Sequence, residues 1–274
     1  MIGRYTWRTL VLEVGLILVA LIYLLPAFGL INISLKAPNN SSGPLEVAGN
    51  YTFANYGLAW HDGHLGPALS NSAFIAIVGV VLVVVVGALA AYPLARISRR
   101  WSTVVFYLFL IGLVLPGQIG LLPLFRQMQD LGLVGSVWSI IFIAVGGGMP
   151  FSVFLFTAFL RQLPREYEEA AVIDGCGPVR VFIYIVLPLL RPAIGTVAIL
   201  SALAIWNDFF TPLLYLSGSA NETVPIRILG FVGEYFTNYP AIFAALAITS
   251  LPILVMFLAL QRSVIQGFSG GLKG

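Results

Sequence analysis

The chain has 274 residues, of which 59% are hydrophobic and only 9% are charged, and its mean hydropathy is +0.97. This composition excludes a water-soluble globular protein and indicates an integral membrane protein. The net charge of +3 does not indicate nucleic-acid binding, because 14 basic residues are sparse in a chain of this length. The single cysteine, Cys176, excludes an intrachain disulfide and a thiolate zinc cluster.

Six stretches are apolar enough, and long enough, to cross a bilayer, for which about 20 residues are needed. They cover residues 10–34, 70–94, 103–125, 137–160, 192–216 and 240–260. We therefore expect an all-α integral membrane protein with six transmembrane helices. Residues 1–274 are expected to form a single transmembrane domain.

The lysine and arginine residues indicate the orientation, because cytoplasmic loops are enriched in them. Those assigned to one side of the membrane are Arg4, Arg8, Arg96, Arg99, Arg100, Arg161, Arg165, Arg180, Arg191, Arg262 and Lys273. Only Lys36, Arg126 and Arg227 fall on the other side. This asymmetry predicts that both termini, the loop 161–191 and the tail 261–274 are cytoplasmic. The connection 35–69 is then an external loop.

The external loop 35–69 contains two histidines, His61 and His64. A protein metal site usually needs three or four ligands, so two solvated histidines are favoured over a metal site. We expect no metal or cofactor in this chain.

The loop between the fourth and fifth spans is predicted to be a helical hairpin. Pro164 suits the start of its first helix, and the carboxylates of Glu166, Glu168 and Glu169 are favoured near a helix N-terminus. Gly175 follows at the position where a left-handed C-terminal cap is usual. Asp174 adds a fourth acidic residue, so the loop is predicted to be a site and not a mere connection.

The second helix of the hairpin is predicted to begin at Pro178 and to end at Pro188. Apolar residues at helical spacing form one stripe on it: Val179, Phe182, Ile183, Val186 and Leu187. The helix is too short to cross a bilayer, which takes about 20 residues. A partly apolar hairpin on the cytoplasmic side suggests a soluble partner that receives it.

The hairpin carries the pattern Glu-Ala-Ala-x3-Gly-x9-Ile-x-Leu-Pro, formed by Glu169, Ala170, Ala171, Gly175, Ile185, Leu187 and Pro188. This pattern resembles the signature loop of bacterial ABC importer permease subunits. Asn71-Ser72, Trp206-Asn207-Asp208-Phe209 and the ending from Gln261 to Gly274 are similar to the carbohydrate-uptake branch, in particular its second, maltose-permease-like subunit.

The resemblance implies a type I importer fold and an assembly in the bacterial inner membrane. The implied partners are a second permease chain, expected to be a different chain, two cytoplasmic ATPase subunits and an external solute-binding protein. In this family the signature loop forms a coupling helix that docks in a cleft of an ATPase subunit, and the C-terminal tail can also reach the ATPase pair. ATP and magnesium are expected on the ATPase subunits.

A membrane arm that follows the closure of an ATPase needs a stiff lever, and the residues of the hairpin suit this task. We expect Glu169 to make a charged contact with the ATPase, while Ala170 and Ala171 allow close approach and Gly175 fixes the bend.

The fifth span contains Asp208, whose carboxylate would cost about 2.5 to 3.5 kcal/mol if it faced lipid at mid-bilayer. It should therefore face protein or water. One hypothesis is a translocation pathway lined by Gln118, Trp206, Asn207 and Asp208. The other is an interhelical hydrogen bond or a contact with a partner subunit. The residues alone leave both open.

The function that these features predict is a permease subunit of an ATP-driven carbohydrate importer, with a short helix or re-entrant piece at 217–239. The alternative is a six-span secondary transporter or channel without an ATPase. Neither a Walker motif nor a Ser/His/Asp or Cys/His arrangement occurs in the sequence, so catalysis by this chain is not expected. No residue pattern identifies the solute.

Overall fold

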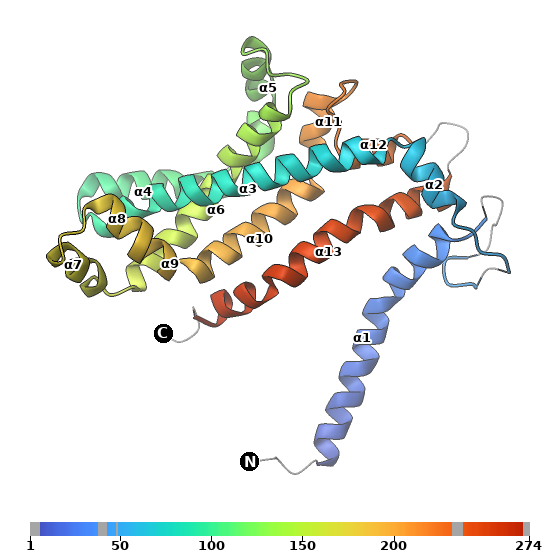
Figure 1. Ribbon diagram of the computed structural model, residues 1–274, viewed down its shortest axis with the longest axis horizontal. Helices are drawn as coiled ribbons and strands as arrows, with labels where there is room; N and C mark the ends of the chain where they lie inside the picture. Colours follow the sequence, from blue (N-terminus) through green and yellow to red (C-terminus); the bar gives the residue numbers. More distant parts are fainter. Residues whose placement is uncertain (1–5, 38–42, 48, 232–237, 271–274) are drawn as a thin grey trace. The chain divides into compact units, whose positions relative to one another are not determined.

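A computed structural model describes residues 6–37, 43–47, 49–231 and 238–270, and it is helical almost throughout (Figure 1). Among these residues the only β-type pairing is an isolated bridge between Lys36 and Tyr51. The expected all-α class is therefore confirmed. The chain divides into two compact units, which are described separately below.

The smaller unit contains the described parts of residues 1–66 and 227–251. Its first helix, α1, is Trp7–Ser34, and α2 is Ala54–His61. The connection between them is held to the end of α1 by buried side chains. The Asn32 amide donates to the carbonyls of Pro44 and Glu46, and the Asn55 amide donates to those of Ser34 and Lys36, at 2.7–2.9 Å. Within the expected external loop 35–69, the carbonyls of Lys36, Pro44 and Glu46 are thus paired with side chains.

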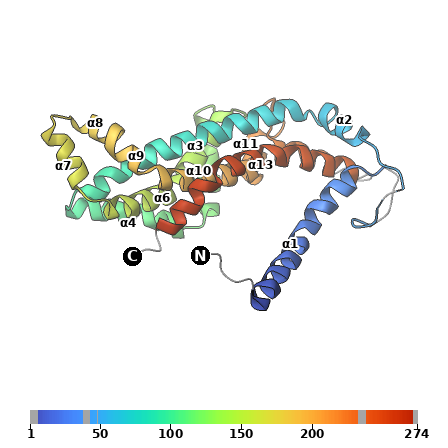
Figure 2. The same cartoon turned by 60° about the horizontal axis from the view of Figure 1, so that its bottom comes forward.

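The larger unit contains the described parts of residues 67–226 and 252–274. The long helix α3 is Leu65–Arg96, α4 is Arg100–Val114 and α6 is Val137–Gln162. Figure 1 and Figure 2 both show α3, α6 and α10 (Arg191–Asn207) running alongside one another. A Cβ on Gly87 of α3 would collide with the Ser152 side chain of α6, so this glycine is required for the close approach of the two helices.

The third expected span, 103–125, is not one continuous helix. Helix α4 ends at Val114, and Leu115 is extended (φ −69°, ψ 128°) before Pro116. The proline ring disfavours helical geometry at the preceding residue, which explains the break. A 3-10 turn, η1 (Gly117–Gly120), and a short helix, α5 (Leu121–Asp130), follow.

The fifth expected span, 192–216, is also interrupted. Helix α10 ends at Asn207, Asp208 is extended (φ −68°, ψ 117°), and α11 covers Phe210–Leu216. The Asp208 carboxylate accepts a hydrogen bond from the backbone N–H of Thr211 at 3.1 Å. Asp side chains offer the backbone an alternative to helix in this way, which gives the interruption a local cause.

Four described helices are long and apolar enough to cross a membrane, or up to five if a bent helical pair counts as one span. The four are α1, α3, α6 and the first part of α13 (Tyr239–Gly270), while α4 is shorter. The expected number of six continuous helices is therefore not confirmed. Helix α13 runs beyond the expected end of the last span at residue 260. The region 217–239 contains α12 (Val224–Leu229).

Candidate functional site

The predicted hairpin lies at one end of α3 and α6 (Figure 1 and Figure 2). Its first helix, α7, is Glu166–Ile173, with three acidic residues in the first turn. The N–H of Cys176 donates to the carbonyl of Ala171 at 2.9 Å, and the N–H of Gly175 donates to that of Val172 at 3.0 Å. These two bonds form a Schellman cap, in which Gly175 has the left-handed φ of +82°. Gly175 therefore fixes the bend, as its position in the sequence predicts.

Replacing Gly175 should loosen this bend. We expect Gly175→Ser to destabilise the loop by about 1 to 2 kcal/mol, because a Cβ is disfavoured at left-handed φ. The matched control is Gly177→Ser, since Gly177 has φ −71° at the N-cap of the next helix, a position that serine favours. Denaturation midpoints of the purified complexes measure the difference, and equal midpoints for the two variants would contradict the expectation.

The signature residues of α7 divide between the inside and the outside of the chain. Ala171 is buried, while Glu169, Ala170 and Asp174 are exposed. Two apolar neighbours, Val172 and Ile173, are also exposed, the latter by 85% of its surface. Residues 166–190 are called the coupling hairpin below, after their predicted role, and its outer face carries both acidic and apolar side chains.

The second half of the hairpin differs from the expected regular helix. It begins at Pro178 with α8 (Pro178–Val181), continues as a π-helix, η2 (Phe182–Val186), and ends with α9 (Leu187–Leu189). The segment thus ends at Leu189, one residue after the expected end at Pro188. The axis then bends by 74° into α10.

The expected apolar stripe on this segment is wrong in part. Val179 and Ile183 are exposed. The side chains that pack inward are Val181, Phe182, Ile185, Val186, Leu187 and Leu190. A π turn holds more residues than an α turn, so it shifts the register of the buried face. Ile185 and Leu187 of the signature pattern are thus inner packing residues.

The hairpin and the membrane helices share one hydrophobic core. Ala171 and Val186 of the hairpin belong to the same buried cluster as Ala91 of α3, Phe156 of α6 and Val197 of α10. Protein interiors are close-packed, so they transmit a displacement and do not absorb it. A force on the hairpin would therefore reach all three helices.

The sequence places Glu168 among the acidic residues of the first turn of α7, but it does not identify the partners of this side chain. Its carboxylate forms an ion pair with Arg96, the last residue of α3, at 2.6 Å, and it accepts a hydrogen bond from Tyr92 at 2.8 Å. The available signal was the spacing of Tyr92 and Arg96, which places both on one face of α3 close to its end.

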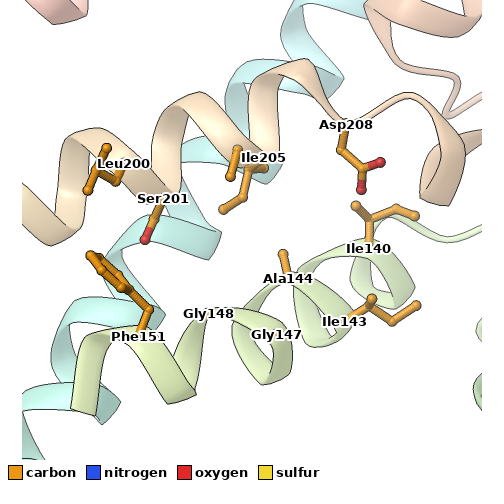
Figure 3. A pocket seen from close by; sticks show the side chains of 11 residues that line it. Ile140, Ile143, Ala144, Gly147, Gly148, Phe151, Leu200, Ser201, Ile205 and Asp208 are labelled. Atoms are coloured by element: carbon orange, nitrogen blue, oxygen red, sulfur yellow. The ribbon is translucent and has the colours of Figure 1, made fainter. Parts of the chain in front are cut away.

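Asp208 lines a pocket of about 350 Å³ between α6 and α10 (Figure 3). Its wall on α6 includes Gly147 and Phe151, and its wall on α10 includes Ser201. Figure 3 shows the Ser201 hydroxyl and the Asp208 carboxylate on the side that faces α6. The pocket thus combines an aromatic ring with two oxygen-bearing side chains in an otherwise apolar surface.

The other residues of the hypothetical pathway do not line this pocket. Trp206 and Asn207 are absent from its lining, and the Asn207 amide donates to the carbonyl of Leu203 at 2.9 Å. Gln118 lies in η1, but its side chain is outside the described part of the structure. His61 and His64 do not belong to a larger cluster of potential metal ligands, since no group of three or more such residues occurs in the described part of the chain.

Residues 83–270 match the family described as binding-protein-dependent transport system inner membrane component. This match covers more than half of the chain, so the chain belongs to that family. It is a multi-pass inner-membrane permease component of an ABC importer, as the signature loop indicates. Family membership decides against the alternative of a secondary transporter or channel.

Individual relatives carry sugar-related names. The chain is 36% identical over 259 residues to the melibiose/raffinose/stachyose import permease protein MelC of Bacillus subtilis, with 94% of each chain covered. It is 32% identical over 259 residues to the diacetylchitobiose uptake system permease protein NgcG of Streptomyces coelicolor, with 93% of this chain and 86% of the relative covered.

A solved structure supports the fold. A chain of a bacterial ABC transporter involved in the import of the acidic polysaccharide alginate superimposes with a TM-score of 0.80 at 21% sequence identity. The superposition covers 94% of this chain and 98% of the other. The likeness places the chain in the fold of ABC importer permeases.

Proposed function

We propose that this chain is the permease subunit of an ATP-driven importer for a carbohydrate or a related polar solute. The proposal assigns it a second, different permease chain, two cytoplasmic ATPase subunits that bind ATP and magnesium, and an external solute-binding protein. The observation that carries it is the coupling hairpin, whose outer face is exposed while its inner face joins the core of α3, α6 and α10. The sugar-related names of the relatives support a carbohydrate as the solute.

The coupling hairpin is the part that docks on the ATPase. Glu169 makes the charged contact, and Val172 and Ile173 supply exposed apolar surface beside it. Contiguous exposed apolar surface next to polar residues is characteristic of an interaction site. Closure of the ATPase pair then pushes the hairpin, tilts the helices that share its core, and switches the cavity from inward-facing to outward-facing.

The pocket beside Asp208 belongs to the translocation pathway in this proposal. Hydroxyl-rich solutes are recognised by carboxylates and hydroxyls, and sugar-binding surfaces gain from an aromatic face; Asp208, Ser201 and Phe151 provide these groups. Gln118, Trp206 and Asn207 remain hypothetical members of the translocation pathway. They would line the part of it that a second permease chain completes.

The orientation follows from the positive residues. Arg96, Arg161 and Arg191 lie at the ends of α3, α6 and α10 that adjoin the coupling hairpin, and Arg165 is the N-cap of α7. Placing these ends in the cytoplasm satisfies the positive-inside rule and puts both termini inside the cell. The chain then crosses the membrane six times, with the broken segments α4–α5 and α10–α11 each counted as one crossing.

The test is ATP-driven uptake by the assembled complex. A tagged copy of the chain is purified with its partners from the native host and reconstituted in liposomes with the binding protein. The solutes offered are melibiose, diacetylchitobiose and an arabinooligosaccharide, the last because a further relative is named an arabinooligosaccharides transport system permease protein. We expect uptake of at least one of them only with ATP and the binding protein present. Uptake by the chain alone, without ATP, would overturn the proposal.

A further inference from the structure

Glu168 has both carboxylate oxygens engaged within the chain. One oxygen, Oε1, forms an ion pair with Arg96 Nη2 at 2.6 Å and accepts a hydrogen bond from Arg96 Nε at 2.8 Å. The other, Oε2, accepts a hydrogen bond from the Tyr92 hydroxyl at 2.8 Å. The side chains of Arg96 and Glu168 are only 13% and 15% exposed. Charged hydrogen bonds of this length in partly buried positions are strong and geometrically specific.

Arg96 also connects the ends of two membrane helices. It is the last residue of α3, and its Nη1 donates to the carbonyl of Leu163, the C-cap of α6, at 3.3 Å. In return, Arg165 donates from Nη2 to the carbonyl of Arg96 at 3.1 Å. The termini of α3 and α6 and the first turn of α7 therefore meet at one arginine.

Tyr92 extends this contact to the second half of the hairpin. Its ring lies against that of Phe182 in the π-helix, with the two centroids 5.4 Å apart. One tyrosine side chain thus touches α7 through its hydroxyl and η2 through its ring.

Packing alone holds α7 weakly. Of its eight residues only Ala171 is buried. A pocket of about 480 Å³ opens between α7, α8 and α3, lined in part by Tyr92, Glu168 and Val181. The apolar contact between α7 and α3 is therefore limited to the core around Ala171, and the polar contacts of Glu168 add a specific link between the two helices.

We propose that Tyr92, Arg96 and Glu168 form a joint that makes α3 move together with the coupling helix α7. The proposal rests on the proposed function, since it assumes that an ATPase moves α7. The peptide chain links α7 to α6 on one side and to α8 on the other, but nothing covalent links it to the end of α3. The joint supplies that link. Its members are positioning residues, because they act on α3 and do not contact the solute.

The experiment measures solute molecules imported per ATP hydrolysed, in liposomes that contain the full complex and the binding protein. We expect Glu168→Gln to lower this ratio about tenfold while ATP hydrolysis continues, because the strong charged hydrogen bonds are lost. The matched control is Glu166→Gln, which removes the same charge from an exposed residue of the same helix and should leave the ratio unchanged. An unchanged ratio in Glu168→Gln would overturn the proposal.

Three further variants keep the outcome decisive if Glu168→Gln assembles poorly. Arg96→Glu alone should uncouple import from hydrolysis, and the double variant Arg96→Glu with Glu168→Arg should recover a large part of the ratio. Tyr92→Phe removes only the hydroxyl and keeps the ring against Phe182, so a smaller decrease is expected. A double variant that assembles and hydrolyses ATP but is no better coupled than Arg96→Glu would count against the joint.

The failure of the joint and the failure of the proposed function give different results. If the wild-type chain imports solute alone and without ATP, the proposed function fails before the variants are compared. If the wild type imports and all variants keep its ratio, the function stands and the joint is rejected.

Discussion

Reversing the charge of Glu169 should weaken the binding of the permease chain to its ATPase subunits and reduce uptake. Glu169 is exposed on the outer face of the coupling hairpin, so Glu169→Lys leaves the packing of the chain intact. We expect uptake to fall by about tenfold or more, because a hydrogen bond to a charged group contributes roughly 1.5 to 3 kcal/mol and each 1.4 kcal/mol corresponds to a factor of ten. The ATPase should co-purify with the variant in a smaller amount.

Glu166→Lys is the matched control for Glu169→Lys. It makes the same change of charge on an exposed residue one helical turn earlier, outside the signature pattern. Uptake and co-purification should stay close to wild type in this control. Equal losses in the two variants would mean that net charge matters and the position does not. Full activity of Glu169→Lys would remove Glu169 from the ATPase contact.

The coupling hairpin could be predicted well because its signals are local. An acidic first turn, a glycine in the cap position and a proline at the next helix start each determine the conformation of the backbone around them, and Gly175 adopts the left-handed conformation that its position indicates. Glu169 is exposed and Ala171 is buried in the chain's own core, while the expected contact of Glu169 with the ATPase and the close approach of Ala170 and Ala171 stay predictions.

The features that the sequence did not reveal depend on distant residues. Arg96 and Glu168 are 72 positions apart, so neither one identifies its partner before the helices are placed. The π turn at 182–186 has no distinctive local pattern, and it altered the buried face of the second helix. The helix break before Pro116 was also not predicted, although its cause is local. Proline disfavours helical geometry at the preceding residue, but the continuous apolar run 103–125 favoured one uninterrupted span.

Asp208 combines a feature that local sequence predicts with features that it does not. Its charge within an apolar segment predicts that it avoids lipid, and it is half-buried beside a pocket. The sequence could not predict that α10 ends one residue earlier and that Asp208 accepts the hydrogen bond from Thr211. This local hydrogen bond is neither of the two roles expected for Asp208, which were a translocation pathway and an interhelical or partner-subunit contact, and it leaves both of them as hypotheses. One carboxylate oxygen stabilises the helix break, while the side chain also lines the pocket.

A large side chain placed in the pocket beside Asp208 from the α6 side should block solute uptake without stopping ATP hydrolysis. Gly147 lines the pocket, and a Cβ at this position meets no atom within 4 Å, so Gly147→Leu places its side chain in open space. We expect uptake to fall about tenfold or more, since forcing extra volume into an occupied site costs roughly 1 to 3 kcal/mol. ATP hydrolysis stimulated by the binding protein should continue. The measurement is uptake and hydrolysis by the same liposomes.

Gly146→Leu is the control, because Gly146 is the preceding residue of the same helix, has equally open space around a Cβ, and does not line the pocket. Both substitutions replace glycine by a better helix former, so any gain in helix stability is shared. A loss of uptake in Gly147→Leu alone places the solute beside Asp208. Equal uptake in both variants would exclude the pocket from the pathway, and the interpretation of Asp208 as a structural cap would then suffice.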